Sequence, residues 1–208
     1  MKSTEKLRDS SPRYQLIAIG ASAGGLPALS AVLGSINGDF PGIVIVQHLD
    51  PRHQSQMADL LSKKAKKSVT EARHGERILP GHIYIGPPDE HLLVSHGKIQ
   101  LAHSRLVRFS RPSIDIMFGS VAAVYGEQAI GVILSGSNRD GADGIAAIKG
   151  AGGVTLAQDP VGAEFRVMPQ AAIDTGCIDM VLPLEGIGKA LSQLIEKGIT
   201  TGWQKKFR

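Results

Sequence analysis

Two continuous apolar runs, at residues 43–46 and 130–134, constrain the fold of this chain more than any other feature. Runs without polar alternation are typical of strands that are buried on both faces of a parallel sheet. Residues 15–19 form another strand-like segment, and residues 26–33, after Gly24-Gly25, place apolar side chains at helical spacing. Strand, glycine-rich turn, helix and buried strand in this order predict a βαβ unit.

Turn and capping signals extend this pattern along the chain. Residues 92–94 and 99–101 flank a turn-like tetrapeptide, which predicts a β-hairpin. Ser113 has the position of an N-cap before a helix at 114–124. The other predicted strands are 69–70, 82–85, 154–157 and 178–181, and the other predicted helices are 142–149, a short one from Pro169, and 184–197.

The charge of the chain is concentrated at its ends and in one predicted helix. The net charge is +4, but without residues 1–13 and 205–208 the chain has 16 basic and 17 acidic residues. A helix at 55–67 is expected to bury Leu60 and Leu61, with Met57, and to expose a basic run that no aromatic side chain interrupts. This run consists of Lys63, Lys64, Lys66 and Lys67. We interpret it as a solvated helix face and expect no nucleic-acid partner.

Composition places the chain among ordinary globular domains and excludes disordered, collagen-like and coiled-coil classes. It has 208 residues, of which 42% are hydrophobic and 20% charged. We expect a disordered lead-in at 1–13, one domain at 14–198 and a basic tail at 199–208. The single cysteine, Cys177, together with the lack of a signal peptide and of a long apolar run, indicates a cytoplasmic protein without membrane insertion.

The first predicted strand ends in a turn, residues 20–24, that fits the pattern G-x-S-x-G. This pattern places Ser22 on a sharp bend between a strand and a helix, where a serine is exposed at the carboxyl edge of the sheet. The helix N-terminus beside it favours a developing oxyanion. Two other interpretations remain open at this point: Ser22 caps the helix, or the turn cradles a phosphate.

His48 follows the second predicted strand. Because parallel strands bring their carboxyl ends to one edge, His48 is expected to lie near Ser22. A strand-end histidine bonded to a backbone carbonyl is the alternative, and His53 at a predicted helix start is a rival base. The remaining histidines show no zinc-ligand spacing, so we expect no metal and no other cofactor. They are His74, His82, His91, His96 and His103.

The third strand end carries two carboxylates in the stretch 134–144. Asp143 is expected to cap the helix that follows, which leaves Asp140 to orient a histidine. A nucleophile, a base and an orienting acid on three strand ends are what nucleophilic acyl transfer requires. The chain order Ser22, His48, Asp140 differs from the order Ser, Asp, His of α/β-hydrolases.

With these residues in place, the chain resembles the catalytic domain of the chemotaxis protein-glutamate methylesterase (CheB-type) family. The resemblance spans residues 15 to about 195, and its motifs follow in the family's order and spacing. The matching stretches are Ile-Gly-Ala-Ser-Ala-Gly-Gly at 19–25, Val-Gln-His-Leu-Asp-Pro at 46–51, Gly-Pro-Pro-Asp-Glu-His-Leu-Leu-Val at 86–94, Arg-Pro-Ser-Ile-Asp at 111–115, Leu-Ser-Gly-Ser-Asn-Arg-Asp-Gly at 134–141 and Ala-Gln-Asp-Pro at 157–160.

The resemblance implies a three-layer α/β/α fold with a mostly parallel, doubly wound sheet of about seven strands, which the βαβ pattern supports. It implies a serine hydrolase that demethylates γ-glutamyl methyl esters on a receptor-type signalling protein, releases methanol and also deamidates glutamine. The family's nucleophile, base and acid fall on Ser22, His48 and Asp140. Backbone amides of Ala23 and Ser137 are expected to hold the oxyanion.

Two local departures from the family's pattern stand near these positions. Asn138 replaces a usual glycine, and its tolerance of positive φ is expected to limit the effect. Near residue 165 the family usually shows Gly-Met-Pro, whereas here Arg166-Val167 precede Met168-Pro169, which puts the shape of a substrate loop in question. The family's receiver domain is not expected in the 14 residues before the first strand, so we expect an open site, with control from substrate presentation or from a separate regulator.

Two alternatives from other classes complete the interpretation. A nucleotide-binding module would use the turn at 20–25, but this turn lacks the P-loop lysine, and His48 stands where a ribose-binding acid is expected. A non-catalytic scaffold on the same fold is the other alternative. Labelling by a serine-directed reagent would distinguish it from the hydrolase.

Overall fold

The computed structural model describes residues 14–48 and 55–197. Its centre is a seven-stranded sheet with strand order β3-β4-β2-β1-β7-β8-β9, in which every pair of neighbours is parallel. The predicted sheet, of about seven mostly parallel strands, is thereby confirmed. The strands are β1 (Leu16–Ala21), β2 (Gly42–Gln47), β3 (Val69–Glu71), β4 (Ile83–Ile85), β7 (Ala129–Ile133), β8 (Val154–Gln158) and β9 (Met180–Leu182).

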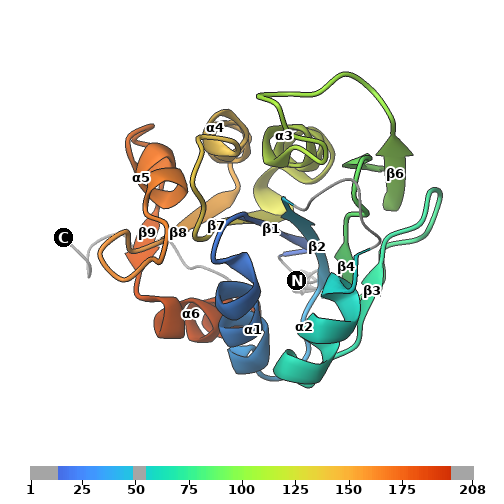
Figure 1. The fold of residues 1–208 in the computed structure, drawn as a ribbon. Coiled ribbons are helices and arrows are strands. Elements are labelled where there is room, and N and C mark those ends of the chain that lie inside the picture. The colour runs from blue at the N-terminus through green and yellow to red at the C-terminus, as the bar shows by residue number, and fades with distance from the viewer. Residues whose placement is uncertain (1–13, 49–54, 198–208) are drawn as a thin grey trace, which may run out of the picture.

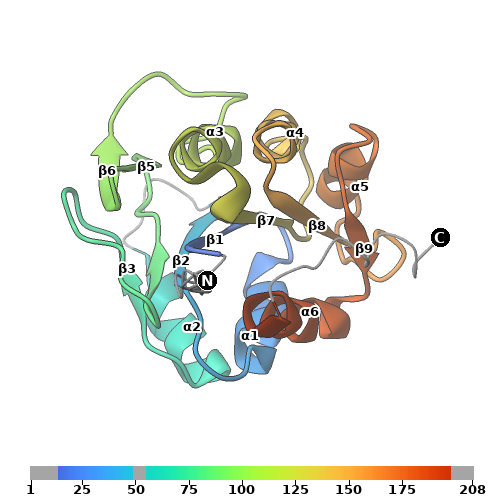
Figure 2. The same ribbon diagram turned by 180° about the vertical axis from the view of Figure 1, so that it is seen from behind.

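Helices cover both faces of the sheet, which gives three layers (Figures 1 and 2). One face carries α1 (Gly25–Ser35), α2 (Met57–Ala65) and α6 (Leu184–Lys197), and the other carries α3 (Ile114–Tyr125), α4 (Ala142–Gly150) and α5 (Val167–Ile173). A short 3₁₀ helix, η1 (Gly126–Gln128), joins α3 to β7. Among the described helices, none is both long and apolar enough to cross a bilayer.

The central strand β1 supplies side chains to both cores, because successive residues of a strand point to opposite faces. Ile17 and Ile19 belong to the core under α1 and α6, while Leu16 and Ala18 belong to the core under α3 and α4. All six residues of β1 are buried. This double burial explains why the strand is apolar throughout.

The predicted hairpin is also present, as a separate two-stranded antiparallel sheet of β5 (His91–Ser95) and β6 (Lys98–Ala102). It lies beside α3, where the amide of Val94 donates a hydrogen bond to Ser120 Oγ at 3.0 Å. The hairpin thus extends the layer formed by α3.

Some predicted boundaries and orientations differ from the structure. α2 is shorter than the predicted 55–67 helix, and Leu60, which was expected to face inward, is 38% exposed. α5 begins at Val167, two residues before Pro169. Proline is tolerated in the first turn of a helix, because the backbone N–H that it lacks would have no partner within the helix there. The predicted segments 1–13 and 199–208 lie outside the described residues.

Candidate active site

Three loops meet at the carboxyl edge of the sheet. β1 lies between β2 and β7, with Ala21 paired to Gln47 and Gly20 paired to Ile133. Since the strands are parallel, the residues that follow them emerge at the same edge. Ser22, His48 and the loop that carries Asp140 are therefore neighbours in space.

The turn after β1 holds Ser22 by its backbone. The amide of Ser22 donates to Ser135 O at 2.9 Å, and Gln47 Nε2 donates to Ser22 O at 2.8 Å. Gly24 has φ 72°, and a Cβ at this position would lie 2.7 Å from Ser135 Oγ, so the turn requires glycine here. Gly24 is also the N-cap of α1, and within the described residues no side chain caps this helix. The interpretation of Ser22 as a helix cap is therefore wrong.

The His48 ring lies between Ser22 and Asp140. Nδ1 is 3.1 Å from Ser22 Oγ, and Nε2 is 2.8 Å from Asp140 Oδ2. The carboxylate can only accept, so the hydrogen-bond network assigns the proton of neutral His48 to Nε2. Nδ1 then carries a lone pair that can accept a hydrogen bond from the Ser22 hydroxyl. The rival base His53 lies outside the part of the chain that the structure describes.

Asp140 is fully buried at the N-terminus of α3. Oδ1 accepts from Ser113 Oγ at 2.9 Å and from the amide of Asp115 at 3.1 Å, and Oδ2 accepts from the amide of Ile114 at 2.7 Å as well as from His48. Burial alone would raise the pKa of Asp140, but these hydrogen bonds outweigh it and lower the pKa. An ionised carboxylate is thus held against Nε2 of His48. Ser113 itself caps α3, as predicted.

Asp143 does not cap α4, which corrects the sequence-based prediction. The N-cap of α4 is Gly141, without a side-chain cap. Instead, Asp115 Oδ1 accepts from the amides of Gly141 at 2.9 Å and Gly144 at 2.8 Å. Asp143 has a 73% exposed side chain and pairs with Arg108. The carboxylate that accepts hydrogen bonds from the N-terminal amides of α4 is therefore on α3, 26 residues earlier in the chain than Gly141.

Burial dominates the pKa of Asp115, whereas hydrogen bonds outweigh it at Asp140. It raises the pKa of Asp115 to about 6; the hydrogen bond from Gly144 lowers it, and the nearby charge of Asp140 raises it further. The two carboxylates have matching roles. Asp140 accepts hydrogen bonds from amides at the start of α3, and Asp115 accepts hydrogen bonds from amides at the start of α4. Each helix is thereby tied to the loop of the other.

Asn138 does not have the positive φ that was expected to accommodate it. Its Oδ1 accepts from the amide of Asp140 at 3.0 Å, and its Nδ2 lies 3.3 Å from Nδ1 of His48. The second departure, Arg166-Val167, forms the N-cap and the first residue of α5. Backbone bonds from Gly136 to Phe165 and from Met168 to Gly136 join this segment to the loop after β7.

The two amides predicted to bind an oxyanion belong to Ala23, directly after Ser22, and to Ser137, in the loop after β7. Ser22's own amide is occupied by Ser135 O. Within the described residues, neither the Ala23 amide nor the Ser137 amide donates a hydrogen bond to another protein group. Ser135 Oγ donates to Ala23 O at 2.8 Å, which connects the two turns.

Sequence reasoning missed several residues that support the site. Gln47 Nε2 donates to the carbonyls of both Ser22 and His48, at 2.8 and 2.9 Å, and so fixes the two turns relative to each other. His91 is fully buried and bonds to the amide of Ser113 and to Arg105 O. A polar residue inside or next to an otherwise apolar strand was the available signal, and both residues show it.

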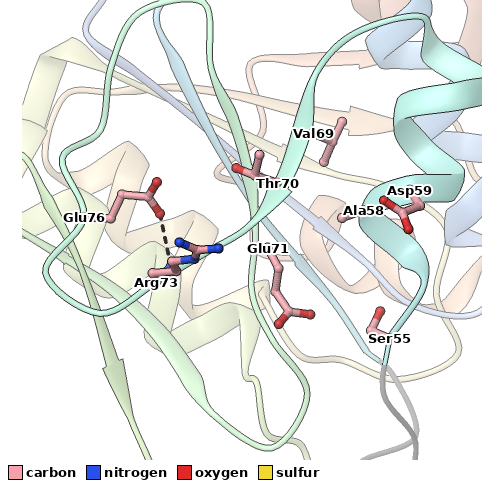
Figure 3. Close-up of a pocket in the computed structure, with 8 residues that line it drawn as sticks. All are labelled: Ser55, Ala58, Asp59, Val69, Thr70, Glu71, Arg73 and Glu76. Carbon is pink, nitrogen blue, oxygen red and sulfur yellow. Dashed lines mark hydrogen bonds between the residues drawn. The ribbon is translucent and has the colours of Figure 1, made fainter.

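A pocket of about 570 Å³ lies elsewhere, between α2 and β3 (Figure 3). The amide of Arg73 donates to Glu76 at 3.1 Å in its wall. None of Ser22, His48 and Asp140 lines it. Its lining residues are Ser55, Ala58, Asp59, Val69, Thr70, Glu71, Arg73 and Glu76.

The parallel three-layer fold and the Ser22–His48–Asp140 arrangement define an α/β protein with the geometry of a serine-hydrolase site. The particular family follows from comparison with known proteins. A family model described as CheB methylesterase matches residues 17–191, and the chain belongs to this family.

Relatives and a solved structure agree with this assignment. The chain is 39% identical over 188 residues to a putative protein-glutamate methylesterase/protein-glutamine glutaminase of Leptospira interrogans, covering 89% of this chain and 97% of that protein. It is 39% identical to protein-glutamate methylesterase/protein-glutamine glutaminase 2 of Anaeromyxobacter dehalogenans, covering 93% of this chain and 58% of that protein. The Thermotoga maritima CheB methylesterase catalytic domain superposes with a TM-score of 0.83 at 32% identity, covering 88% of this chain and 99% of that one.

Proposed function

We propose that the chain hydrolyses γ-glutamyl methyl esters on a receptor-type signalling protein in the cytoplasm and deamidates glutamine by the same route. The observation that carries this proposal is the hydrogen-bonded chain Ser22 Oγ, His48 Nδ1, His48 Nε2, Asp140 Oδ2, with distances of 3.1 and 2.8 Å at its two ends. Family membership and the relatives' names, protein-glutamate methylesterase/protein-glutamine glutaminase, support the substrate class.

Acylation begins when Nδ1 of His48 takes the proton of Ser22 and Oγ attacks the ester carbonyl. Asp140 fixes the ring with Nε2–H toward its carboxylate and stabilises the imidazolium that forms. The amides of Ala23 and Ser137 are the proposed donors to the tetrahedral oxyanion. Nδ1–H then protonates the departing methoxide, so methanol leaves and the glutamyl group stays on Ser22.

Deacylation repeats these steps with water as the nucleophile. Nδ1 takes a proton from the water, whose oxygen attacks the acyl carbonyl, and returns it to Ser22 Oγ as the glutamate carboxylate leaves. When the substrate is a glutamine side chain, ammonia takes the place of methanol as the leaving group. The same acyl-enzyme serves both reactions, so one set of residues accounts for both activities.

A nucleotide-binding function is less well supported by the same geometry. A phosphate-binding turn uses free backbone amides, whereas the Ser22 amide is bonded to Ser135 O and the amide of Gly25 to Ser22 O. His48 is directed at Ser22 instead of leaving the turn open. A phosphate at this turn would compete with contacts that the protein already makes.

Labelling with a serine-directed fluorophosphonate, followed by mass mapping, tests the proposal together with methanol release from a methylated receptor peptide. We expect the label on Ser22 and its loss in Ser22→Ala and His48→Ala. Ser30→Ala is a matched control, because Ser30 Oγ donates to Leu26 O within α1 and takes no part in the site. Absence of label on Ser22 together with saturable nucleotide binding would contradict the proposal.

A further inference from the structure

The side-chain amide of Asn138 lies against the nitrogen that the mechanism uses. Nδ2 of Asn138 is 3.3 Å from Nδ1 of His48, and Ser22 Oγ is 3.1 Å from the same atom. We propose that Asn138 is a positioning residue that donates a hydrogen bond to Nδ1 of His48 and competes with Ser22 for its single lone pair. This inference rests on the proposed function, because it assigns a role in the same proton transfer.

The orientation of the Asn138 amide follows from its other contact. The amide of Asp140 donates to Asn138 Oδ1 at 3.0 Å, so the oxygen must face Asp140 and the NH₂ group must face His48. An NH₂ group can donate but not accept. The contact with Nδ1 is therefore favourable only while Nδ1 has no proton.

With its proton on Nε2, the His48 ring has a single lone pair on Nδ1 that can accept a hydrogen bond. Among the described residues, the side chains bonded to the His48 ring are Ser22, Asn138 and Asp140. Asp140 is the titratable one, and Asp115 lies behind it on α3. Because Asp140 holds the proton on Nε2, both remaining donors compete for Nδ1.

This competition has opposite effects on the two states of the base. In the resting site the Asn138 hydrogen bond stabilises neutral His48 and its ring orientation. Once His48 takes the Ser22 proton, Nδ1–H faces the NH₂ group, and two donors oppose each other. Asn138 thus stabilises the resting form of the base and retards the proton transfer that begins acylation.

Two substitutions separate the donor from the rest of the side chain. Asn138→Gly removes both contacts. Asn138→Asp keeps an oxygen for the Asp140 amide but replaces the donor by a carboxylate oxygen, which favours a proton on Nδ1. Arg139→Gln, at an exposed position in the same loop, makes an equal change in net charge without touching His48.

The pH profile of kcat/KM for methanol release is the first measurement. We expect Asn138→Gly to raise the alkaline plateau by about two- to tenfold, the range of one hydrogen bond, and to move the acid limb to higher pH. Asn138→Asp should move the acid limb to higher pH by about one unit, and Arg139→Gln by much less. A uniform loss at every pH in both Asn138 variants, with the acid limb in place, would show a purely structural role and overturn the proposal.

The second measurement needs no turnover. Long-range ¹H–¹⁵N NMR spectra of the His48 ring report donors to Nδ1, and the Ser22→Ala background removes the serine's contribution. On that background we expect Asn138→Gly to move the Nδ1 resonance toward that of a nitrogen without a hydrogen bond. An unchanged resonance would refute the contact even if the enzyme is active. A moved resonance on that background, together with no methanol release by the unsubstituted protein, would refute the proposed function and leave the contact in place.

Discussion

Among single residues, Asp140 connects the hydrogen-bonded chain of the candidate site to the N-terminus of α3. It receives one hydrogen bond from His48 and three from the first residues of α3 and their N-cap, and it has no exposed surface. An amide in its place could not satisfy all of these donors, because its NH₂ group would face two of them. The carboxylate proposed to orient His48 is thus also one that the fold requires.

Asp140→Asn should therefore lower both activity and stability. We expect loss of most methanol release and a decrease of about 1–3 kcal/mol in the free energy of unfolding, or about 2–4 °C in Tm per kcal/mol. The lowered pKa of Asp140 means that its stabilising contribution is present above its ordinary value of 3.8 and is lost as the pH falls through the lower folded value. Thermal unfolding at pH 7 and at acidic pH measures both effects.

His48→Ala and Asp143→Asn are the controls for this prediction. His48→Ala should abolish activity with a smaller change in Tm, because it removes one of Asp140's four donors. Asp143→Asn should change activity less than about twofold, because an exposed ion pair with Arg108 contributes only about 0–1 kcal/mol. Equal losses of activity in Asp143→Asn and Asp140→Asn would show that the wrong carboxylate has been assigned.

Ser22 and His48 are expected to act as one unit. Ser22→Ala and His48→Ala should each reduce kcat by at least about 10³-fold, and the double variant should be no worse than either single variant. Proton transfer from Oγ to Nδ1 needs both groups, so the second loss removes nothing further. Methanol release under single-turnover conditions provides the comparison, and multiplicative losses would contradict the triad.

At the scale of elements, α3 and α4 are bound to each other through their N-termini. Asp115 on α3 accepts the amides of Gly141 and Gly144, and Gly144 packs where a Cβ would meet Phe118 and the backbone of Asp115. The loop between β7 and α4 carries Asp140. The spacing of these two helices therefore sets the position of the carboxylate behind His48.

Gly144→Ala should push the two helices apart. Its Cβ would lie 2.6 Å from Phe118 Cβ and 3.0 Å from Asp115 Cα, and neither helix can yield without moving the Asp140 loop. We expect a loss of about 1–3 kcal/mol in stability and a fall in kcat. Gly119→Ala on α3 is the matched control, because its Cβ meets nothing within 4 Å and alanine favours the helix by about 0.8–1.0 kcal/mol. Unfolding curves that rank the two variants the other way would refute this packing argument.

Asp115 should make stability depend on pH in the opposite sense to Asp140. Its pKa is raised to about 6, so its favourable contribution is complete below its ordinary value of 3.8 and is lost as the pH rises through about 6. Asp115→Asn keeps an oxygen for Gly141 and Gly144 but cannot ionise. Relative to this variant, the wild type should lose stability between about pH 4 and pH 6 in denaturant titrations. A difference that is constant over this range would contradict the raised pKa.

The elements and the three candidate residues were predictable for a common physical reason. Strands buried on both faces are apolar throughout, as β1 is, and parallel strands bring their ends to one edge, where Ser22, His48 and Asp140 follow. Contacts between remote side chains were not predictable. Asp143 has the right sequence position to cap α4, yet the amides are reached by Asp115, because the packing of α3 decides which carboxylate is near.

The same limit explains the interpretation of Asn138. A sequence shows that asparagine tolerates positive φ, but not that its amide reaches His48, which is 90 residues away in the chain. Leu60 shows the same limit, since its helical spacing predicts a buried side chain, whereas the structure leaves it 38% exposed. Backbone pattern predicts elements well, whereas side-chain partners depend on how those elements pack.

At the scale of the whole molecule, the sheet is assembled out of sequence order. β1 lies between β2 and β7, so the strand that supports Asp140 pairs directly with the first strand of the sheet, although more than 100 residues separate them. On a ribosome, the segments that carry Ser22 and His48 emerge long before the segment that carries Asp140. A nascent chain that ends before β7 has one open side of β1 and no carboxylate for its histidine. Hydrolytic activity should therefore appear late in synthesis, after β7 and the following loop have left the exit tunnel. A nascent chain that lacks these segments should not hydrolyse the substrate.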